Sequence, residues 1–325
     1  MRLVLAPIHG VTLAYYRNLH KKYIGGFDEY HAPFIVTTDD RQSSSLLFKD
    51  VHKEMNNDDV VVIPQLLSNN GDHFLNYGNK LVELGYDKVN WNIGCPFPVV
   101  TKKLRGSGIM QYPEMVDKFL DKVFSGANFK VTVKMRLGYE DLDEGIEVMK
   151  VLNKYPLAGL TIHGRTGLQK YEGRVDLDAF DLLFGLSKHV VTYNGDIYTP
   201  EDLTYVRDRY PTINDFMLGR GAMRNPLLPL IINDSQLTEA QLLEKFINFH
   251  DSVVAHFSSR PSTEKALVDK LKSFWTYTAD LIDPDQIYIN DLRRVQTRYA
   301  YDTITDRMIT NSNVKFRESV KKGFK

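Results

Sequence analysis

The sequence lacks the features that would place the chain in a membrane or outside the cell. It contains a single cysteine, so no disulfide can form within the chain. No apolar run approaches the roughly 18 residues that a membrane span needs. The first ten residues, MRLVLAPIHG, meet proline and glycine too soon for a signal peptide. Together these absences predict a cytoplasmic protein that does not associate with a membrane.

Net charge is also absent, because 41 Lys and Arg residues balance 41 Asp and Glu residues. The chain as a whole therefore does not attract nucleic acid or an anionic membrane, and a polyanionic partner would have to be bound by a local basic patch. What the chain does have is an ordinary globular composition: 325 residues, 43% of them hydrophobic, are enough for one large domain and a smaller one.

The first two-thirds of the chain repeats one pattern, in which a short apolar strand is followed by a turn and an amphipathic helical segment. Eight strands are expected, at residues 3–7, 29–36, 60–67, 88–94, 131–137, 159–165, 189–195 and 215–221. Eight strands that alternate with helices predict a parallel sheet closed into a (β/α)8 TIM barrel. An open, doubly wound sheet is the alternative, but no G-x-G-x-x-G follows the first strand.

Beyond about residue 235 the pattern predicts a small all-helical C-terminal domain. Thr238 to Gln241 fits a capping box, and the apolar residues after it fall on one helical stripe. Further helices are expected over 262–282, from Asp283-Pro284 onward, and over 303–322. The sequence thus divides into a catalytic barrel domain over 1–235 and a helical domain over 236–325.

The end of the helical domain is basic. From Arg293 onward there are nine Lys and Arg residues against three acidic residues. Such a run is as common on a solvated helix face as in an RNA-binding surface, so it does not decide between the two.

In a (β/α)8 barrel the active site lies at the carboxyl ends of the strands. The residues at those ends form a polar and chemically varied set: Pro7, Gln65, Asn92, Cys95, Lys134, Arg136, His163, Arg165, Asn194, Asp196, Gly219 and Arg220. Any one of them could be a structural residue that pairs with a neighbour, but a purely structural role for the whole set is improbable.

Cys95 is the only thiol, and it lies between Gly94 and Pro96 at the end of a strand. A lone cysteine is more often a small buried hydrophobe than a reactive group. The glycine permits a sharp turn and the proline stiffens the chain after it, which argues against a position inside a strand. With the polar Asn92 beside it, the thiol is placed for chemistry.

Two glycine-containing turns follow the last two strands, Asn194-Gly195-Asp196 and Gly219-Arg220-Gly221. Glycine lets backbone N–H groups approach an anion, and Arg220 can hold a phosphate through two parallel N–H donors. Barrels commonly bind a phosphate at these two loops. The pattern therefore predicts a phosphorylated cofactor whose ring lies over the barrel mouth.

Three polar residues would face such a ring: Gln65, Lys134 and His163. A lysine beside the N1–C2=O edge of a flavin would stabilise the anionic reduced flavin. A flavin ring would suit these three residues.

Several short motifs, taken together, resemble the tRNA-dihydrouridine synthase family. In chain order they are LAPIHGVT, PQLL, NIGCP followed by VTKKLRGSGIM, VKMRLG, IHGRT, NGDI and LGRGAMRNP, and they cover nearly the whole expected barrel. The resemblance implies an FMN-binding barrel that reduces the C5–C6 double bond of a uridine in tRNA. It also implies NADPH as the reductant of the flavin and a helical domain that binds tRNA.

The resemblance assigns roles to individual residues. Cys95 matches the proton donor. The residues implied to contact FMN are Pro7, Ile8, His9, Gln65, Lys134, His163, Asn194, Gly195, Asp196, Gly219 and Arg220. Those implied on the substrate side are Asn92 and Arg136 near the uracil, with Lys102, Lys103 and Arg105 on the loop after Cys95 for the RNA backbone. No metal and no protein partner are expected.

The chain departs from the family pattern at three places. Ile8 stands where methionine is usual, which is a tolerable apolar exchange. Asn90 replaces an aspartate that is usual two residues before Asn92, and this puts a supporting contact in question. The segment Arg105-Gly106-Ser107-Gly108 has fewer glycines than the usual loop, which would alter the cover over the substrate.

Two other classes of function were weighed against a tRNA enzyme. A small-molecule FMN oxidoreductase of the dihydroorotate or dihydropyrimidine dehydrogenase type would share the fold, but a free pyrimidine does not need a helical tail of roughly 85 residues. A non-catalytic RNA-binding module would not need Cys95, Lys134 and His163. The tRNA enzyme is favoured, and its uridine would have to be extruded from the folded tRNA to reach a barrel mouth.

Overall fold

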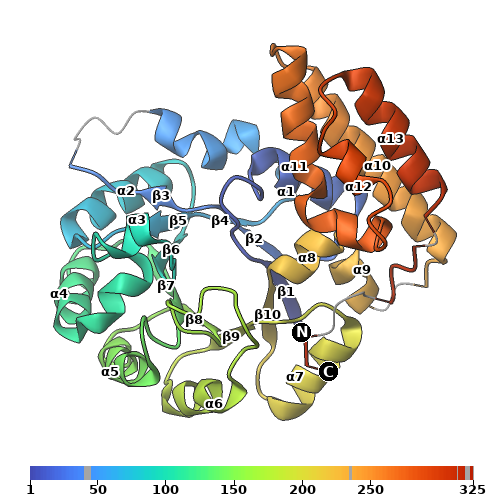
Figure 1. Cartoon of the computed structure of the whole chain (residues 1–325). Coiled ribbons are helices and arrows are strands. Elements are labelled where there is room, and N and C mark those ends of the chain that lie inside the picture. Colours follow the sequence, from blue (N-terminus) through green and yellow to red (C-terminus); the bar gives the residue numbers. More distant parts are fainter. Residues whose placement is uncertain (40–44, 234–235, 313, 319–322, 325) are drawn as a thin grey trace. The chain divides into compact units, whose positions relative to one another are not determined.

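The computed structural model of the chain describes residues 1–39, 45–233, 236–312, 314–318 and 323–324 (Figure 1). These residues form two compact units. The first holds residues 1–14, 28–195 and 210–218, and the second holds residues 15–27, 196–209 and 219–325. The boundary therefore follows contacts in space and not simply the order of the chain.

The first unit is built on one parallel sheet. Its strands are β1 (Arg2–Leu5), β2 (Glu29–His31), β3 (Ile35–Val36), β4 (Val62–Ile63), β5 (Gln65–Leu67), β6 (Lys88–Ile93), β7 (Lys130–Arg136), β8 (Gly159–His163), β9 (Val191–Asn194) and β10 (Asp215–Leu218). The order across the sheet is β3-β5-β6-β7-β8-β9-β10-β1-β2-β4, and every pair is parallel.

This sheet closes on itself because the two ends of its strand order belong to the same pair of neighbouring stretches, residues 29–36 and 62–67. β2 pairs with β4 while β3 pairs with β5, so the same two stretches of chain run beside each other on both sides of a break. Pro33 follows β2 and Pro64 separates β4 from β5. Proline has no N–H to donate to the ladder, which accounts for both interruptions. Counting each interrupted pair once gives the eight strands of a (β/α)8 barrel, and that prediction is confirmed.

Helices cover the outside of the sheet, as Figure 1 shows for β6 to β9. In the first unit they are α2 (Gly71–Glu83), α3 (Pro98–Thr101), α4 (Pro113–Phe124), α5 (Leu142–Leu152) and α6 (Leu177–Leu186). The fully buried Trp91 of β6 stacks on Phe119 of α4 with ring centroids 3.9 Å apart. Such aromatic contacts fix α4 and its neighbours against the sheet.

The amino ends of the strands carry a cluster of charges. Arg2, Glu29, Lys88 and Asp215 are the first residues of β1, β2, β6 and β10. Glu29 pairs with Arg2 and with Lys88, whose Nζ lies 3.0 Å from its carboxylate, and Arg2 also pairs with Asp215. Because these groups satisfy one another at the amino edge, the polar groups available for chemistry are those at the carboxyl edge.

The second unit is helical. Its helices are α1 (Ala14–Tyr23), α7 (Pro200–Arg209), α8 (Arg220–Arg224), α9 (Leu228–Ile232), α10 (Glu239–Ser258), α11 (Glu264–Ile282), α12 (Ile289–Leu292) and α13 (Arg298–Thr310). The predicted capping box is present at the start of α10, where Thr238 and Gln241 cap each other's backbone N–H groups. Among the described residues no strand follows β10, as expected, and no helix is long and apolar enough to cross a membrane.

The helix expected from Asp283-Pro284 onward does not form, and that prediction is wrong. The Asp283 carboxylate accepts hydrogen bonds from the backbone N–H groups of Ile287, Tyr288 and Ile289 at 2.7–2.9 Å. Gln286 has a φ of +57°, which a helix does not allow. A side chain that satisfies the backbone locally competes with the helix, so a turn leads into the short α12.

The last predicted helix is also displaced. It was expected over 303–322, but α13 runs from Arg298 to Thr310, and residues 319–322 lie outside the described part of the chain. The earlier start follows from Thr297, whose hydroxyl accepts the N–H of Ala300 and caps the helix.

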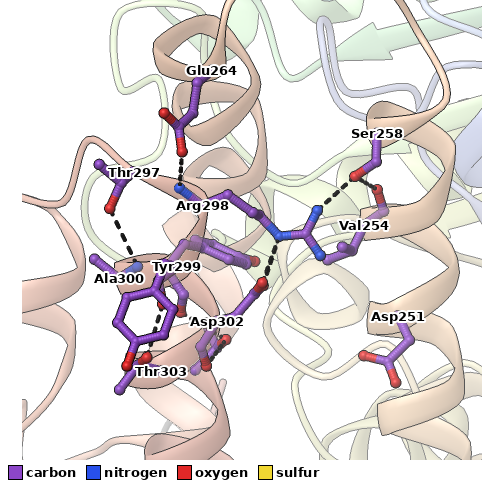
Figure 2. Close-up of polar contacts among 12 residues, drawn as sticks. Asp251, Val254, Ser258, Glu264, Thr297, Arg298, Tyr299, Ala300, Asp302 and Thr303 are labelled. Carbon is purple, nitrogen blue, oxygen red and sulfur yellow. Dashed lines mark hydrogen bonds and ion pairs between the residues drawn. The ribbon is translucent and has the colours of Figure 1, made fainter.

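Arg298 joins α13 to α10 and α11 (Figure 2). Its Nε lies 2.7 Å and 2.8 Å from the two carboxylate oxygens of Asp302, and its Nη1 donates to the Ser258 hydroxyl at 2.7 Å. The backbone N–H of Arg298 donates to Glu264 at 2.9 Å. This member of the basic run therefore holds three helices together, while Arg293, Arg294 and Arg307 are exposed.

Candidate active site

The candidate active site lies at the carboxyl edge of β5 to β9. The first unit brings together there the predicted residues Asn92, Cys95, Lys134, Arg136, His163 and Asn194, and Gln65, the first residue of β5, contacts Asn92. The register places Asn92 opposite Lys134, and His163 between Arg136 and Asn194 on the neighbouring strands. Lys134 and Arg136 are two residues apart on β7, so their side chains point to the same face of the sheet.

Asn92 fixes the turn that carries Cys95. Its Oδ1 accepts the backbone N–H groups of Gly94 at 3.0 Å and of Cys95 at 2.9 Å. Backbone N–H groups can only donate, so this oxygen assignment leaves the Asn92 amide nitrogen as a donor, and it donates to Gln65 Oε1 at 2.7 Å. Gln65 Oε1 is therefore the acceptor, which leaves Gln65 Nε2 free to act as a donor on its other side.

The chain of amides continues inward from Gln65. Its Nε2 donates to Asn90 Oδ1 at 2.7 Å, and Asn90 Nδ2 donates to the Thr132 hydroxyl at 2.8 Å. An aspartate at position 90 could accept from Gln65 but could not donate to Thr132. Asn90, which departs from the family pattern, therefore keeps the contact with Gln65. It also donates the hydrogen bond to Thr132, which an aspartate could only accept.

The thiol of Cys95 lies in an apolar setting. Cys95 is buried with Leu67 and Val100, and Phe34 packs against this cluster. Burial raises the pKa of the Cys95 thiol, although the backbone of Phe97 and the charges of Arg136 and Lys134 oppose the shift. The thiol therefore holds its proton at neutral pH.

The segment after Cys95 returns to touch it. The Cys95 carbonyl accepts the backbone N–H of Ser107 at 3.0 Å and the Ser107 hydroxyl at 3.1 Å. Gly106 has a φ of +55°, and a Cβ at this position would overlap the carbonyl oxygen of Cys95. Only glycine fits at position 106. Although this loop has fewer glycines than is usual, it has one at the position that contacts Cys95.

Lys134 is half-buried and donates one hydrogen bond from Nζ to Asn194 Oδ1 at 2.9 Å. Burial, together with the nearby charge of Arg136, lowers the pKa of Lys134 to about 7. The Asn194 amide is held by a bond from its Nδ2 to the Met217 carbonyl at 2.8 Å. An anionic group bound beside Nζ would favour the protonated form of Lys134.

Arg136 is buried and binds backbone carbonyl groups. Its Nε donates to Gly94 at 2.9 Å, and its Nη1 donates to Thr166 and to Lys170 at 2.7 Å each. The guanidinium carbon also lies 5.4 Å from the ring centroid of Tyr171. Arg136 thus ties the Cys95 turn to the loop after β8, which is a contribution that its position in the sequence does not reveal.

The loop after β6 presents two of its three predicted basic side chains to solvent. Lys102 and Lys103 are exposed. Arg105 is half-buried and donates from Nε to Asn69 Oδ1 at 3.2 Å. Lys102 and Lys103 are therefore better placed than Arg105 to contact an RNA backbone.

Of the remaining residues of the first unit that the sequence predicts to contact FMN, His163 is the last residue of β8, and the others lie between secondary-structure elements. Pro7 and Ile8 are half-buried after β1, and the exposed ring of His9 stacks on Phe34 at 5.5 Å. Gly195 follows β9 with a φ of +151°, and a Cβ there would meet the side chain of Val175. His163 is buried, with Nε2 lying 3.4 Å from Nη1 of Arg165.

In the second unit, Asp196 and Arg220 form an ion pair of 3.1 Å. Asp196 has a φ of +39° and a nearly buried carboxylate, and the Arg220 guanidinium lies 5.9 Å from the ring centroid of Tyr198. Gly219 precedes Arg220 at the start of α8. The ion pair limits the positions that the Arg220 guanidinium can take.

A family model described as dihydrouridine synthase (Dus) matches residues 4–311. The chain belongs to the dihydrouridine synthase family. It is 32% identical over 254 residues to tRNA-dihydrouridine synthase B of Pasteurella multocida (strain Pm70), which covers 75% of this chain and 74% of that protein. It is 31% identical over 232 residues to a tRNA-dihydrouridine(16) synthase of Neisseria meningitidis serogroup B, which covers 69% of each.

Solved structures with little sequence similarity share the fold. The old yellow enzyme homologue from Zymomonas mobilis aligns with a TM-score of 0.53 and 9% identity, over 74% of this chain and 92% of that one. Histamine dehydrogenase from Rhizobium sp. 4-9 aligns with a TM-score of 0.56 and 10% identity, over 80% of this chain and 49% of that one. Family membership thus favours the tRNA enzyme over the small-molecule oxidoreductase that the barrel alone allowed.

The dihydrouridine synthase barrel holds three supporting residues that the motifs did not single out as site residues. They are Thr132, Ser107 and Tyr171, which contact Asn90, Cys95 and Arg136 respectively. Thr132 lies two residues before Lys134 on β7, so the alternation of the strand could have placed it on the same face. No comparable signal marks Ser107 or Tyr171, because both reach the site through loops.

Proposed function

We propose that this member of the dihydrouridine synthase family reduces the C5–C6 double bond of a uridine in tRNA, with FMN as its cofactor and NADPH as the reductant. The observation that carries the proposal is that the family match coincides with a buried thiol held by Asn92 at the carboxyl end of β6. The relatives named tRNA-dihydrouridine synthase support tRNA as the substrate.

The polar groups at the barrel mouth fit FMN. Lys134, with its lowered pKa, would lie at the anionic edge of the flavin ring, and Gln65, His163 and Asn194 would contribute polar contacts. Pro7, Ile8 and His9 would line the ring. The phosphate would be held at the turns after β9 and β10 by Gly195, Asp196, Gly219 and Arg220.

When bound, the flavin supplies a hydride to C6 of the uracil. Cys95 holds a proton on Sγ and gives it to C5, and its raised pKa keeps that proton in place at neutral pH. Asn92 keeps the Cys95 turn in position through two backbone N–H groups, and Arg136 keeps it through the Gly94 carbonyl. Burial of the thiol limits the access of water to that proton.

The uridine would leave the tRNA fold to enter the barrel mouth. Lys102, Lys103 and Arg105 would hold the RNA backbone beside it, and the helical domain over 236–325 would bind the body of the tRNA. The exposed Arg293, Arg294 and Arg307 of the basic run would contribute phosphate contacts there.

The direct test is an assay with purified protein, FMN, NADPH and a tRNA transcript that contains no dihydrouridine. We expect dihydrouridine to appear in the digested tRNA, measured by mass spectrometry of nucleosides, and to be absent when free uridine replaces the tRNA. Failure to form dihydrouridine in any tRNA of the source cell, with FMN bound, would overturn the proposed reaction.

Replacing Lys102 and Lys103 together with alanine is expected to weaken tRNA binding by on the order of 10-fold. It should also reduce the slope of log affinity against log salt by about 1.5–2, because each phosphate contact releases roughly one counterion. Filter binding across a salt series measures both quantities.

The matched control replaces Lys150 and Lys154 with alanine. Both are exposed: Lys150 lies in the last turn of α5 and Lys154 follows that helix, which returns from the carboxyl edge of β7 to the amino edge of β8. An equal effect of the two double variants would show that the lysines after α3 make no particular contact with tRNA.

A further inference from the structure

Asp202, in the first turn of α7, binds a segment more than a hundred residues further along the chain. Its carboxylate accepts the backbone N–H groups of Tyr198 and Thr199 at 3.0 Å each, which caps the helix. The same carboxylate accepts the N–H of Gly323 at 3.0 Å and of Phe324 at 3.3 Å. Asp202 is only 4% exposed, so these are buried, charge-assisted hydrogen bonds.

Gly323 also lies directly against the backbone of Asp196. A Cβ at Gly323 would overlap the Asp196 carbonyl oxygen and approach the Asp202 carboxylate. The ring of Phe324 lies 5.0 Å from the ring of Tyr205 on α7. Gly323 and Phe324 therefore pack closely against the stretch from Asp196 to Tyr205. A larger side chain in place of Gly323 would have to displace either its own backbone or that of Asp196.

The Asp196 turn needs support from outside. Its φ of +39° is unfavourable for a residue with a Cβ, at a cost on the order of 1 kcal/mol. The Asp196 carboxylate pairs with Arg220, so the backbone conformation of the turn decides where the guanidinium is held. A contact that stabilises this turn stabilises the ion pair as well.

The same part of the chain also supports the helix that begins with Arg220. The Phe316 carbonyl accepts a hydrogen bond of 2.7 Å from Asn225, the residue that follows α8. Phe316 is buried and lies beside Phe246 of α10 with ring centroids 5.7 Å apart. Residues on either side of 319–322 thus contact both elements that carry the ion pair.

We propose that Asp202 and the segment Gly323-Phe324 are positioning elements for the cofactor phosphate, acting through the Asp196 turn and its ion pair with Arg220. The inference rests on the proposed function, in which Asp196 and Arg220 hold that phosphate. It makes the retention of FMN depend on a segment that follows α13.

The first test replaces Gly323 with alanine, which adds one methyl group against Asp196. FMN affinity, from the quenching of flavin fluorescence, is expected to fall by on the order of 10-fold. Hydrogen exchange at the amides of Tyr198 and Thr199 is expected to quicken, because both donate to Asp202. The matched control is Gly185→Ala on the exposed surface of α6, where a Cβ meets nothing within 4 Å; both quantities should stay unchanged there.

The second test combines Gly323→Ala with Arg220→Ala. If the segment acts through Arg220, its effect on FMN affinity should largely vanish once Arg220 is absent, whereas two independent effects would add. An additive result, or unchanged exchange at Tyr198 and Thr199 in Gly323→Ala, overturns the proposal. If the wild-type protein binds no FMN and modifies no tRNA, the proposed function fails, and the role in the cofactor site fails with it; the exchange measurement still decides separately whether the segment holds the turn.

Discussion

Replacement of Cys95 by alanine is expected to slow uridine reduction by about 10²–10⁴-fold, the usual effect of losing a positioned general acid. The reduction of the flavin by NADPH needs no proton from the thiol, so it should proceed at a near-normal rate. The measurement is single-turnover oxidation of the pre-reduced enzyme by unmodified tRNA, with wild type and variant compared at equal FMN content.

The experiment must also exclude a purely structural role of Cys95 in packing. Because Cys95 is buried with Leu67 and Val100, alanine removes one packed atom and is expected to cost on the order of 1 kcal/mol of stability whatever its chemical role. Unfolding in urea should therefore be recorded beside the rates. A stability loss with equal single-turnover rates would assign Cys95 to packing alone.

Serine at position 95 separates size from acidity. It preserves the shape of the side chain and keeps a donor, but a hydroxyl is a far weaker acid than a thiol, so we expect little recovery of the rate. The raised pKa of Cys95 also gives a sign for the pH dependence. The thiol stays protonated through neutral pH and beyond its usual value, so the contribution of Cys95 to the uridine step should not change with pH until the alkaline range and should then fall as the thiol loses its proton.

Much of this fold can be predicted from the sequence, because its strands are local patterns. The eight apolar runs that alternate with amphipathic helices lie within a few residues of the observed strands. The closure of the barrel follows from their number. Even the two interruptions are explained by local chemistry, since Pro33 and Pro64 remove a ladder donor where each strand breaks.

The parts that could not be predicted depend on contacts between distant residues. Asp283 ends a helical pattern because its carboxylate turns back to three backbone N–H groups, and nothing in the composition of that stretch distinguishes this from a helix start. Arg136 was placed correctly at the end of β7, yet its three backbone acceptors lie in two separate loops. The motif residues on β6 to β9 lie toward the carboxyl ends of their strands, while their hydrogen-bond partners could be identified only in the folded chain.

Lys134 combines a structural cost with a proposed role in the chemistry, and its replacement by methionine should reveal both. The pKa of Lys134 in the folded protein is about 7, below the value of about 10.4 in an unfolded chain. The unfolded state therefore binds more protons between these values, and the stability of the apoprotein should rise as pH increases from 7 towards 10. Below pH 7 the cost of burying the charge is fully present.

Lys134→Met keeps the length of the side chain and removes the charge. At pH 7 we expect the FMN-free variant to be more stable than wild type by on the order of 1–3 kcal/mol, and its stability should lose the rise between pH 7 and 10. With FMN supplied, uridine reduction should fall by about 10²–10³-fold, because the cation that would stabilise the reduced flavin is gone. Urea unfolding across pH and single-turnover kinetics measure the two effects separately.

Lys130→Met is the control on the same strand. Lys130 is 63% exposed at the amino end of β7 and pairs with Asp87, so the same substitution there should change stability by no more than about 0.5 kcal/mol and leave catalysis unchanged. If Lys134→Met instead destabilises the protein, the hydrogen bond from Nζ to Asn194 outweighs the cost of burying the charge. If it stabilises the protein and leaves uridine reduction intact, Lys134 does not stabilise the reduced flavin. A gain in stability together with a loss of turnover is the pair of results expected of a functional lysine whose charge is partly desolvated.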